Sequence, residues 1–334
     1  MWKKARIRKI VVCGAEMILI ISNKQDITVD FVVHELTLRG ASFQRLNTED
    51  IASGKCSITL PGLTLVIQHE CRRLVRLDDI SAVWYRRPGK VFDFVSSTSR
   101  PESDVQKYIE EQWATWLEAL ELAPHCRWIN PVGTASVFEN KVRQLAHAEK
   151  IGFRIPETLV SNDPSAIRAF AEKHQAVIGK ALFAPLLEGD DGDRFIFTTQ
   201  LQNSELTDDA ALKICPAIYQ EALLGKTDYR VTVIGDRLFA VRIEYTASGP
   251  LDWRLVKDEI KFIHEPLPSE IHSRCIEYVK QAGLVFGALD LIRQEGNWFF
   301  IEINPSGEWG WLQYPTGLPI AKAISDELMA FGEP

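Results

Sequence analysis

The sequence lacks the features that define several large functional classes. No apolar run approaches the roughly 20 residues of a membrane-spanning helix, so we expect no membrane partner. The formal net charge of −7 argues against nucleic acid as a partner. Neither a Gly-x-x-x-x-Gly-Lys-Ser/Thr loop nor a kinase catalytic loop occurs. A nucleotide site in this chain therefore cannot be of the P-loop or protein-kinase type.

Its cysteines and histidines are too scattered to indicate a metal site or a nucleophile. The six cysteines include no Cys-x-x-Cys pair and no Cys/His cluster at zinc-ligand spacing. The seven histidines are dispersed, and no Ser-His-Asp or Cys-His set stands out. These absences predict reduced thiols in a cytoplasmic protein. They leave carboxylates, lysines and arginines as the candidate functional groups.

Strands and helices alternate early in the chain and antiparallel strands dominate later, which predicts a mixed α/β (α+β) class. Residues 17–47 predict strand, helix and strand, with Asp26 as the helix N-cap and Gly40 as its stop. This beginning is Rossmann-like, but its first turn has no glycine fingerprint, so we expect no dinucleotide site there. We expect residues 1–16 to be a disordered extension, with Met17 as the functional beginning.

Two later helices carry capping signals. Residues 103–122 begin with a capping-box-like pattern and bear an apolar stripe that includes Trp113 and Trp116, which we expect in the core. A second capping box at residues 136–139 predicts a helix that carries Lys141 near its start and stops at Gly152.

The most informative stretch is a predicted β-hairpin near the C-terminus. Two apolar runs, residues 287–292 and 298–303, flank a turn around Gly296. Such a turn places Asp290 across from Glu302, and Asn304 shares their face because side chains two apart in a strand point the same way. Gathering carboxylates is costly unless a hard cation compensates them, and Mg²⁺ suits these oxygens. The alternative is an exposed hairpin face with ordinary polar residues.

A second predicted hairpin is cationic. Residues 229–234 and 237–244 are joined by a turn at residues 235–236, and we expect Arg230 and Arg242 on one face, roughly opposite each other. Like charges that face each other are destabilising unless an anion lies between them, and guanidinium groups match phosphate oxygens. The alternative is that Glu244 and nearby acids neutralise both arginines.

Three further cations are candidate phosphate contacts. Lys141 lies on a predicted helix, Lys180 ends an apolar strand, and Arg254 follows an aspartate and a tryptophan. With the two hairpins they suggest the metal half and the phosphate half of a site for a magnesium nucleoside triphosphate.

The chain resembles the ATP-grasp superfamily over residues 17–330 and, within it, the ribosomal-peptide maturases of the microviridin or graspetide type. The resemblance rests on the following motifs: Trp84-Tyr85-Arg86-Arg87-Pro88, Asn140-Lys141, Gly152-Phe153-Arg154-Ile155-Pro156-Glu157-Thr158, Phe195-Ile196-Phe197-Thr198-Thr199, Asp252-Trp253-Arg254 and Glu302-Ile303-Asn304-Pro305-Ser306-Gly307-Glu308-Trp309. It implies an ATP-grasp fold with an N-terminal Rossmann-like pre-ATP-grasp domain at residues 17–130, a first lobe at 131–215 and a second lobe with the metal site at 216–334.

The resemblance also implies roles for individual residues, grouped by what they would bind. The implied ATP contacts are Lys141 and Lys180 to the phosphates, Gln220, Glu221, Ala222 and Leu223 to adenine, and Asp228 to ribose. The implied catalytic residues, which would grip the γ-phosphate and the acyl phosphate, are Arg230, Arg242 and Arg254. The implied Mg²⁺ ligands are Asp290, Glu302 and Asn304, and the implied peptide contacts are Arg86 and Arg87.

The reaction implied by this resemblance is ATP-dependent cross-linking of a ribosomal precursor peptide that carries a leader segment. An Asp or Glu side chain becomes an acyl phosphate, and a Ser or Thr hydroxyl or a Lys amine then forms an ester or amide, with release of ADP and phosphate. One rival is an ATP-grasp ligase of the glutamate-ligase type, which joins an amino acid to a protein tail or small molecule. A non-catalytic nucleotide-binding regulator is the other. A homodimer is implied by the resemblance alone.

Overall fold

The computed structural model describes residues 17–61, 64–68, 75–76, 79–96, 99–122, 126–183, 186–187, 194–196, 198–245 and 260–330. The chain divides into two compact units. The first comprises the residues up to Ile129 together with those from Leu328 onward, and the second comprises Asn130–Glu327. Each unit is described by itself. The three-part division predicted from the sequence stays a prediction, and the expected extension at residues 1–16 lies outside the described residues.

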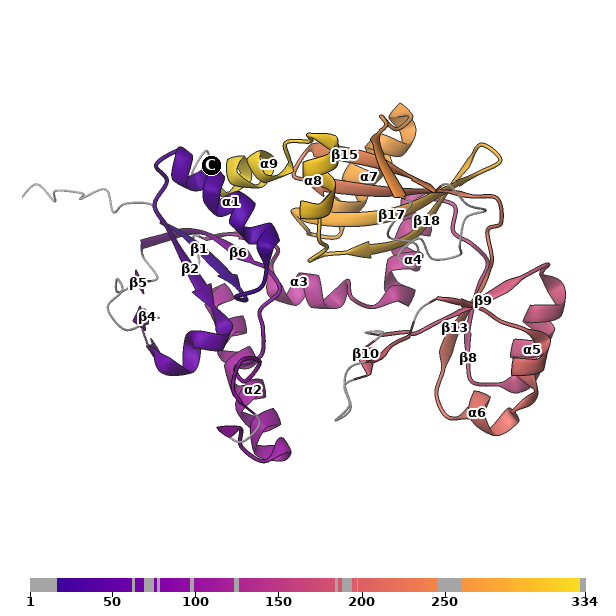
Figure 1. Ribbon diagram of the computed structural model, residues 1–334, viewed down its shortest axis with the longest axis horizontal. Coiled ribbons are helices and arrows are strands. Elements are labelled where there is room, and N and C mark those ends of the chain that lie inside the picture. The colour runs from indigo at the N-terminus through magenta and orange to yellow at the C-terminus, as the bar shows by residue number, and fades with distance from the viewer. Residues whose placement is uncertain are drawn as a thin grey trace, which may run out of the picture. The chain divides into compact units, whose positions relative to one another are not determined.

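The first unit contains a parallel sheet in the order β2-β1-β6-β7 (Figure 1). Its strands are β1 (Met17–Ser22), β2 (Phe43–Asn47), β6 (Ile80–Tyr85) and β7 (Arg127–Ile129). Helix α1 (Ile27–Leu38) connects the first two strands, and the Asp26 side chain caps it by accepting from the Thr28 N–H. The Rossmann-like beginning and the Asp26 cap are therefore confirmed. A separate antiparallel sheet comprises β3 (Lys55–Thr59), β4 (Thr64–Gln68) and β5 (Val75–Arg76), after the 3₁₀ helix η1 (Thr48–Ser53).

Helix α2 (Ser103–Glu118), which continues as the 3₁₀ helix η4 (Ala119–Leu122), is where one core prediction is wrong. Within α2 only Leu117 is buried, whereas Trp113 and Trp116 are half-buried and contact each other edge to face. The predicted capping box is absent too, because the N-cap is Glu102 and makes no side-chain cap bond. An amphipathic stripe gives the direction of a helix face but not the depth to which that face is covered.

The second unit begins with helices and a small antiparallel sheet in the order β12-β9-β13-β8. The strands are β8 (Thr158–Ser161), β9 (Val177–Lys180), β12 (Thr199–Gln200) and β13 (Ala217–Glu221), with the short pair β10 (Leu186–Leu187) and β11 (Arg194–Phe195) as a separate sheet. Helix α5 (Pro164–Lys173), capped by Asp163, packs on this sheet through Ile167, against Val177 and Tyr219. The 3₁₀ helix η5 (Asn203–Thr207) and helix α6 (Asp209–Lys213) precede β13.

Helix α4 (Lys141–Ile151) begins later than predicted. It follows α3 (Val132–Val137), and its N-cap is Asn140, whose side chain accepts from the Arg143 N–H. The predicted helix start at residues 136–139 is therefore wrong, while the stop at Gly152, which adopts the left-handed conformation, is confirmed. Lys141 becomes the first residue of the helix.

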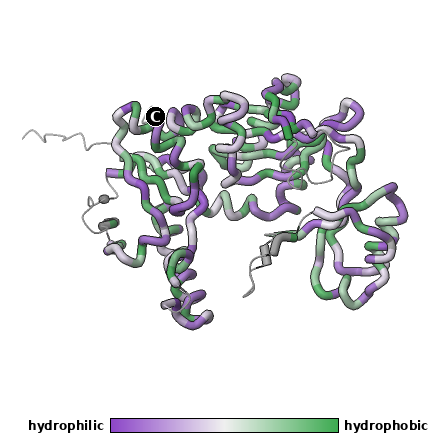
Figure 2. Tube along the Cα trace, viewed as in Figure 1, coloured by the Kyte–Doolittle hydropathy of each residue, from purple (hydrophilic) through white to green (hydrophobic). Residues whose placement is uncertain are grey.

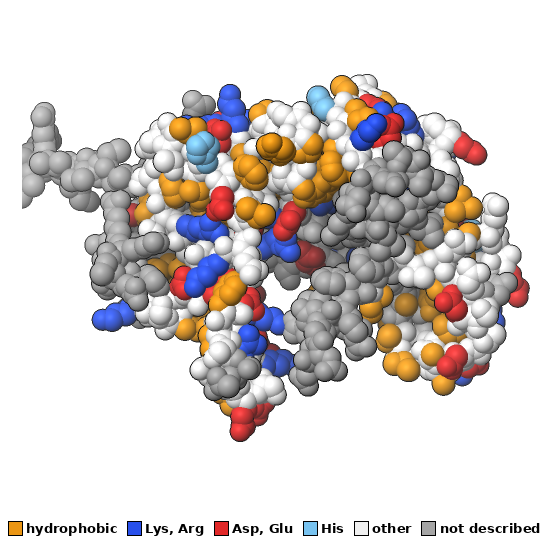
Figure 3. Space-filling model, in the orientation of Figure 1, with side chains coloured by type: hydrophobic (Ala, Val, Ile, Leu, Met, Phe, Trp, Pro, Cys, Tyr) orange, Lys and Arg blue, Asp and Glu red, His pale blue; other side chains and the backbone are white. Residues whose placement is uncertain are grey.

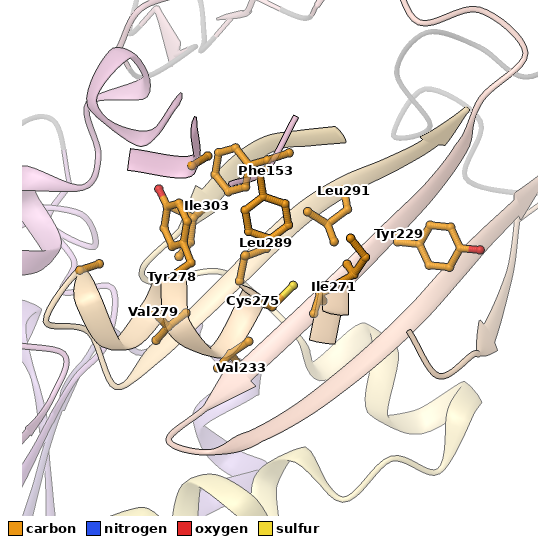
Figure 4. Packing of buried hydrophobic residues seen from close by; sticks show 14 of the residues in the cluster. Phe153, Tyr229, Val233, Ile271, Cys275, Tyr278, Val279, Leu289, Leu291 and Ile303 are labelled. Atoms are coloured by element: carbon orange, nitrogen blue, oxygen red, sulfur yellow. The ribbon is translucent and has the colours of Figure 1, made fainter. Parts of the chain in front are cut away.

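A five-stranded antiparallel sheet in the order β16-β15-β14-β17-β18 forms the centre of the second unit. Its strands are β14 (Thr227–Ile234), β15 (Arg237–Tyr245), β16 (Ile260–His264), β17 (Phe286–Gln294) and β18 (Asn297–Asn304). Figure 2 shows hydrophobic segments running through these strands. Helix α7 (Ser269–Gln281) and α4 contribute to the core on one face, which includes Leu289 and Tyr278 (Figure 4). The Tyr278 ring stacks on that of Phe300. The opposite face, the polar face, carries Arg230, Asp290 and Glu302 beside buried apolar side chains such as Ile234 and Val241.

The remaining helices are α8 (Gly310–Thr316) and α9 (Ile320–Met329). Strand β16 and helix α8 were not predicted from the sequence. Among the described residues, no helix combines the length and apolar character needed to cross a membrane. On the face drawn in Figure 3, acidic and basic side chains of the described residues are interspersed.

Candidate nucleotide and metal site

The candidate site lies on the polar face of the large sheet, where three strands bring charged side chains into line. Arg230 in β14 pairs directly with Asp290 in β17, and Asp290 pairs in turn with Glu302 in β18. Asn304, two residues after Glu302, pairs with Ala288, two residues before Asp290. Directly paired residues point to the same face of a sheet, so the predicted alignment of Asp290 with Glu302 is confirmed.

Arg230 and Asp290 form a largely buried charge pair on this face. The Arg230 Nη1 lies 2.8 Å from the Asp290 Oδ1, and only 8% of Arg230 is exposed. Its Nη2 is 3.5 Å from the Glu308 carbonyl oxygen. A Cβ at Gly307 would lie 3.0 Å from that same Nη2 and 2.5 Å from the Ala288 Cβ, so only glycine lets this turn approach the arginine.

Around Glu302 a cation and a second acid lie close by. The Lys141 Nζ, at the start of α4, is 3.7 Å from the Glu302 Oε2. Burial raises the pKa of the Glu139 carboxyl, and the neighbouring charge of Glu302 raises it further, while Lys141 lowers it. Two carboxylates that repel each other at this end of the sheet favour binding of additional positive charge.

The donor chemistry of this face fits a hard divalent cation. Asp290 and Glu302 supply carboxylate oxygens, and the Asn304 Oδ1, which accepts from the Ser306 N–H at 2.9 Å, keeps a second lone pair for a metal. Across the described part of the chain, no group of three or more His, Cys, Asp or Glu side chains could hold a metal ion. The predicted set contains two such side chains and an amide, so its role as the Mg²⁺ ligands stays a prediction.

Lys180 is held by a chain of buried polar groups in the small sheet. Its Nζ donates to the Gln220 Oε1 at 2.7 Å, the Gln220 Nε2 donates to the Thr158 Oγ1 at 2.8 Å, and the Thr158 Oγ1 donates to the Pro156 carbonyl at 2.8 Å. Gln220 is only 2% exposed. Its side chain therefore orients Lys180, which the sequence did not indicate.

The other residues predicted to contact adenine form hydrogen bonds within the protein or are buried. Glu221 accepts from the Glu157 N–H at 3.0 Å, the Ala222 N–H donates to the Ala176 carbonyl at 3.0 Å, and Leu223 is buried. Their contact with adenine stays a prediction.

Asp228 is a buried acceptor at the start of β14. Its two carboxylate oxygens lie 2.7 and 2.8 Å from the Lys226 Nζ, and the Tyr245 hydroxyl also donates to it. A buried carboxylate that accepts from a hydroxyl has the chemistry that a ribose hydroxyl would require. The ribose contact itself stays a prediction.

The expectation that Arg230 and Arg242 share a face is wrong. The two-residue turn pairs Ile234 with Arg237, so Arg230 lies opposite Val241 and Arg242 lies opposite Tyr229. A displacement of one residue in register moves a side chain to the other face of a sheet. The like-charge argument for an anion between the two arginines therefore fails.

Arg242 instead belongs to an ion-pair cluster on the face that carries Tyr229. Its Nε lies 2.7 Å from the Glu265 Oε2 and its Nη1 3.1 Å from the Glu244 Oε1. Tyr229 donates its hydroxyl to Glu265, and Arg293 is 3.3 Å from the same carboxylate. The hydrogen bond from Tyr229 lowers the pKa of the Glu265 carboxyl, and both arginines lower it further. Neutralisation of Arg242 by Glu244 and a nearby acid, which was the alternative, is what the geometry shows.

Three other predicted arginines have different outcomes. Arg254 lies outside the described residues, so its predicted role is not addressed. Arg86 is only 2% exposed and its Nε lies 3.2 Å from the Asp26 Oδ2, which makes it part of the interior of the first unit and does not support a peptide contact. Arg87 has a positive φ of 44° and its carbonyl accepts from the Asn23 side chain; a peptide contact by Arg87 stays a prediction.

Two kinds of residue near the site were missed. Glu139 was interpreted as part of a capping box, although its position two residues before Lys141 was a signal that it would lie near the predicted phosphate lysine. Two buried carboxamides, Gln144 and Asn130, contact the backbone of Ile303 and Pro305, the residues on either side of Asn304. No local sequence pattern distinguishes them from ordinary surface amides.

Comparison with known proteins supports the same fold. The family described as the MvdD pre-ATP-grasp domain matches residues 17–136. Macrocyclase MdnC from Microcystis aeruginosa, solved with the precursor peptide MdnA, is 24% identical with a TM-score of 0.83, covering 94% of this chain and 99% of that chain. The Chryseobacterium gregarium RiPP-associated ATP-grasp ligase, in complex with ADP and a leader and core peptide, is 27% identical with a TM-score of 0.84, covering 94% and 96%.

Two further similarities bear on the nucleotide and on the rival function. The ATP-grasp ligase PsnB, complexed with a phosphomimetic variant of its minimal precursor, Mg and ADP, is 22% identical with a TM-score of 0.75, covering 94% of this chain and 98% of that chain. A probable alpha-L-glutamate ligase of Pseudomonas putida is 24% identical over 198 residues, which is 58% of this chain. The match spans 64% of the length of that curated relative.

Proposed function

We propose that this chain, whose fold is that of the MvdD-like ATP-grasp ligases, is an ATP-dependent ligase that cross-links a ribosomal precursor peptide. The observation that carries the proposal is the row of Arg230, Asp290 and Glu302 across three adjacent strands, with Lys141 beside Glu302. Support also comes from the ATP-grasp relatives that were solved with ADP and with precursor peptides.

The residues of the site suit the activation of a carboxylate. A carboxylate is a poor electrophile, and transfer of the γ-phosphoryl group of ATP to an Asp or Glu side chain of the peptide supplies a phosphate leaving group. Mg²⁺ bound by Asp290, Glu302 and Asn304 would neutralise charge on the transferring oxygens. Arg230 offers its remaining guanidinium donors to the same oxygens, and the Asp290 carboxylate fixes the plane of that guanidinium.

The lysines bind and orient the nucleotide in this mechanism. Gln220 directs Lys180 from the end of β9, and the start of α4 carries Lys141 to the Glu302 side of the site. When a Ser or Thr hydroxyl or a Lys amine of the same peptide attacks the acyl carbon, the carbon–oxygen bond to phosphate breaks. An ester or amide then remains, and one water has been removed overall per link, with ADP and phosphate released.

The partner that this function requires is a ribosomal precursor peptide with a leader segment, and the compartment that we infer is the cytoplasm. ATP and Mg²⁺ are the inferred cosubstrate and cofactor. A homodimer remains an expectation from the resemblance.

A mass measurement tests the proposal. Candidate precursor peptides encoded beside the gene are incubated with the protein, ATP and Mg²⁺, and we expect the loss of one water per link together with ADP formation. The Glu302→Ala variant should leave the peptide mass unchanged, whereas an Arg242→Met variant, altered on the other face of the sheet, should retain the reaction. An unchanged mass for every candidate precursor would overturn the proposal.

The same experiment separates the glutamate-ligase alternative, to which the partial similarity with the Pseudomonas putida relative points. With free glutamate present, that activity would add the mass of glutamyl residues to an acceptor instead of removing water from a peptide. ATP binding without ADP formation under any condition would indicate a non-catalytic regulator.

A further inference from the structure

Two buried carboxamides border the predicted metal-ligand segment, and the mechanism above uses neither. Asn130 precedes α3 and Gln144 lies in α4, and each is only 3% exposed. An amide buried without partners costs several kcal/mol, so the bonds that each side chain makes determine what it can do in the fold.

Asn130 uses its full hydrogen-bonding capacity. Its Oδ1 accepts from the Val285 and Phe286 N–H groups, both at 2.8 Å. Its Nδ2 donates to the carbonyl oxygens of Phe286 and Pro305, again both at 2.8 Å. Because two donors meet one end of the amide and two acceptors meet the other, its orientation is fixed. Asn130 thereby ties the backbone at the start of β17 to the residue that follows Asn304.

The Gln144 side chain hydrogen-bonds to the backbone of β18. Its Oε1 accepts from the Ile303 N–H at 3.1 Å, and its Nε2 donates to the Ile303 carbonyl at 2.9 Å and to the Phe138 carbonyl at 2.6 Å. β18 is the last strand in the order of its sheet, so among the described strands none pairs with the outer edge of Ile303. The carboxamide takes the place of the missing strand for this one residue.

These two contacts lie on both sides of Asn304, and the one at Ile303 directly follows Glu302. Ile303 stands between Glu302 and Asn304 in the chain, and Pro305 comes next. Holding both peptide groups of Ile303 and the carbonyl of Pro305 limits rotation of the backbone from which the two ligand side chains project. Ligand distances for Mg²⁺ are confined to about 2.0–2.1 Å in near-octahedral geometry, so small backbone rotations matter.

Gln144 also connects the metal side of the site to its lysine. It lies one turn after Lys141 in α4, and the backbone of the same residue is held in place because its carbonyl accepts from the Tyr278 hydroxyl at 3.1 Å. An apolar side chain would fill the same space without the cost of burying an amide. The amide is therefore better explained by the geometry that it imposes than by packing.

We propose that Asn130 and Gln144 are positioning residues, which hold Glu302 and Asn304 in the geometry that binds the divalent cation. This inference rests on the proposed function, since it needs a metal-nucleotide site at these ligands. Loss of an outer-shell partner of this kind typically weakens metal binding by about 10- to 100-fold.

Mn²⁺ is the probe for the test, because its paramagnetic resonance signal reports the free ion directly. The wild type and the variants Gln144→Met and Asn130→Ser are titrated with Mn²⁺ at saturating ADP, and the dissociation constant of Mn²⁺ is measured. We expect each variant to bind Mn²⁺ about 10-fold more weakly than the wild type. Thermal unfolding of each protein without ligand records its loss of stability separately.

Ile271→Ala provides the matched control. Ile271 is a buried residue of α7 in the core on the face of the sheet opposite Arg230 and Asp290 (Figure 4). It should lower the melting temperature as the two variants do and leave the Mn²⁺ dissociation constant unchanged.

Three outcomes would contradict the inference. Wild-type affinity for Mn²⁺ in both folded variants would show that the amides do not position the ligands. Equal weakening in Ile271→Ala would show that a general loss of stability is the cause. Failure of the wild type itself to bind Mn²⁺ with ADP would instead overturn the proposed function on which the inference rests.

Discussion

Each face of the five-stranded sheet carries an arginine that is paired with carboxylates, but the surroundings of the two arginines differ. On one face Arg230 meets a single carboxylate, Asp290, and retains further donors beside Glu302 and Asn304. On the other face Arg242 is held between two carboxylates, Glu265 and Glu244. An arginine surrounded by acids fixes the structure around it, whereas an arginine aligned with metal-type ligands can still bind phosphate.

The largest effect should follow from removing a metal ligand on the Arg230 face. Glu302→Gln keeps the size of the side chain and removes its charge. We expect ADP formation with peptide, ATP and Mg²⁺ to fall by about 1000-fold, because the transferring phosphoryl oxygens lose their cation. The melting temperature should stay the same or rise, since one of two repelling carboxylates is gone. Retention of wild-type turnover would place the metal elsewhere.

Arg230→Lys should have the next largest effect. Lysine keeps the charge beside Asp290 but loses the planar fork that can contact a carboxylate and a phosphate together. We expect the rate of ADP formation to fall by about 100-fold, measured as kcat at saturating ATP. A normal kcat with this lysine would show that charge alone is sufficient.

The equivalent change on the opposite face should affect stability instead of turnover. Arg242→Met removes two ion-paired hydrogen bonds, and we expect the free energy of unfolding to fall by about 2 kcal/mol in urea titrations. ADP formation by the folded variant should remain at the wild-type rate. A loss of activity as large as that of Arg230→Lys would remove the distinction between the two faces.

The smallest effect concerns pH. The pKa of Glu265 is lower in the folded protein than its usual value of 4.5, because Tyr229, Arg242 and Arg293 favour the charged form. Its contribution to stability is therefore present above the unfolded pKa and is lost as the pH falls through the folded pKa. Glu265→Gln should lower the free energy of unfolding by about 1 kcal/mol at pH 7, and the difference from wild type should shrink toward pH 3. A constant difference across this range would contradict the assigned cluster.

Local patterns in the sequence were sufficient for the existence of the two hairpins and for several helix ends, but not for the full register of either hairpin. The Gly296 turn, where Glu295 and Gly296 both have positive φ, pairs Gln294 with Asn297, and a one-residue register shift at Ile301 then brings Asp290 opposite Glu302. The Asp26 cap and the Gly152 stop were equally local. Such features depend on a few adjacent residues, which is why the sequence predicts them.

Features that depend on contacts distant in sequence were missed. The face on which Arg242 lies is set by the register of the hairpin, in which the two-residue turn pairs Ile234 with Arg237. Its ion-pair partner Glu265 directly follows β16, a strand that was not predicted. The depth of Trp113 and Trp116 depends on what covers α2. The contacts of Gln144 with Ile303 span 159 residues, so no local periodicity reveals them.

The central claim is that the polar face of the large sheet binds the metal-nucleotide complex. Fe²⁺ can replace Mg²⁺ beside bound ADP, and with ascorbate and peroxide it cleaves the backbone close to where it is held. The account predicts ADP-dependent cleavage within residues 288–290 and 302–305, read by mass spectrometry and lost in Glu302→Gln. ADP-dependent cleavage that maps away from β17 and β18 would contradict it.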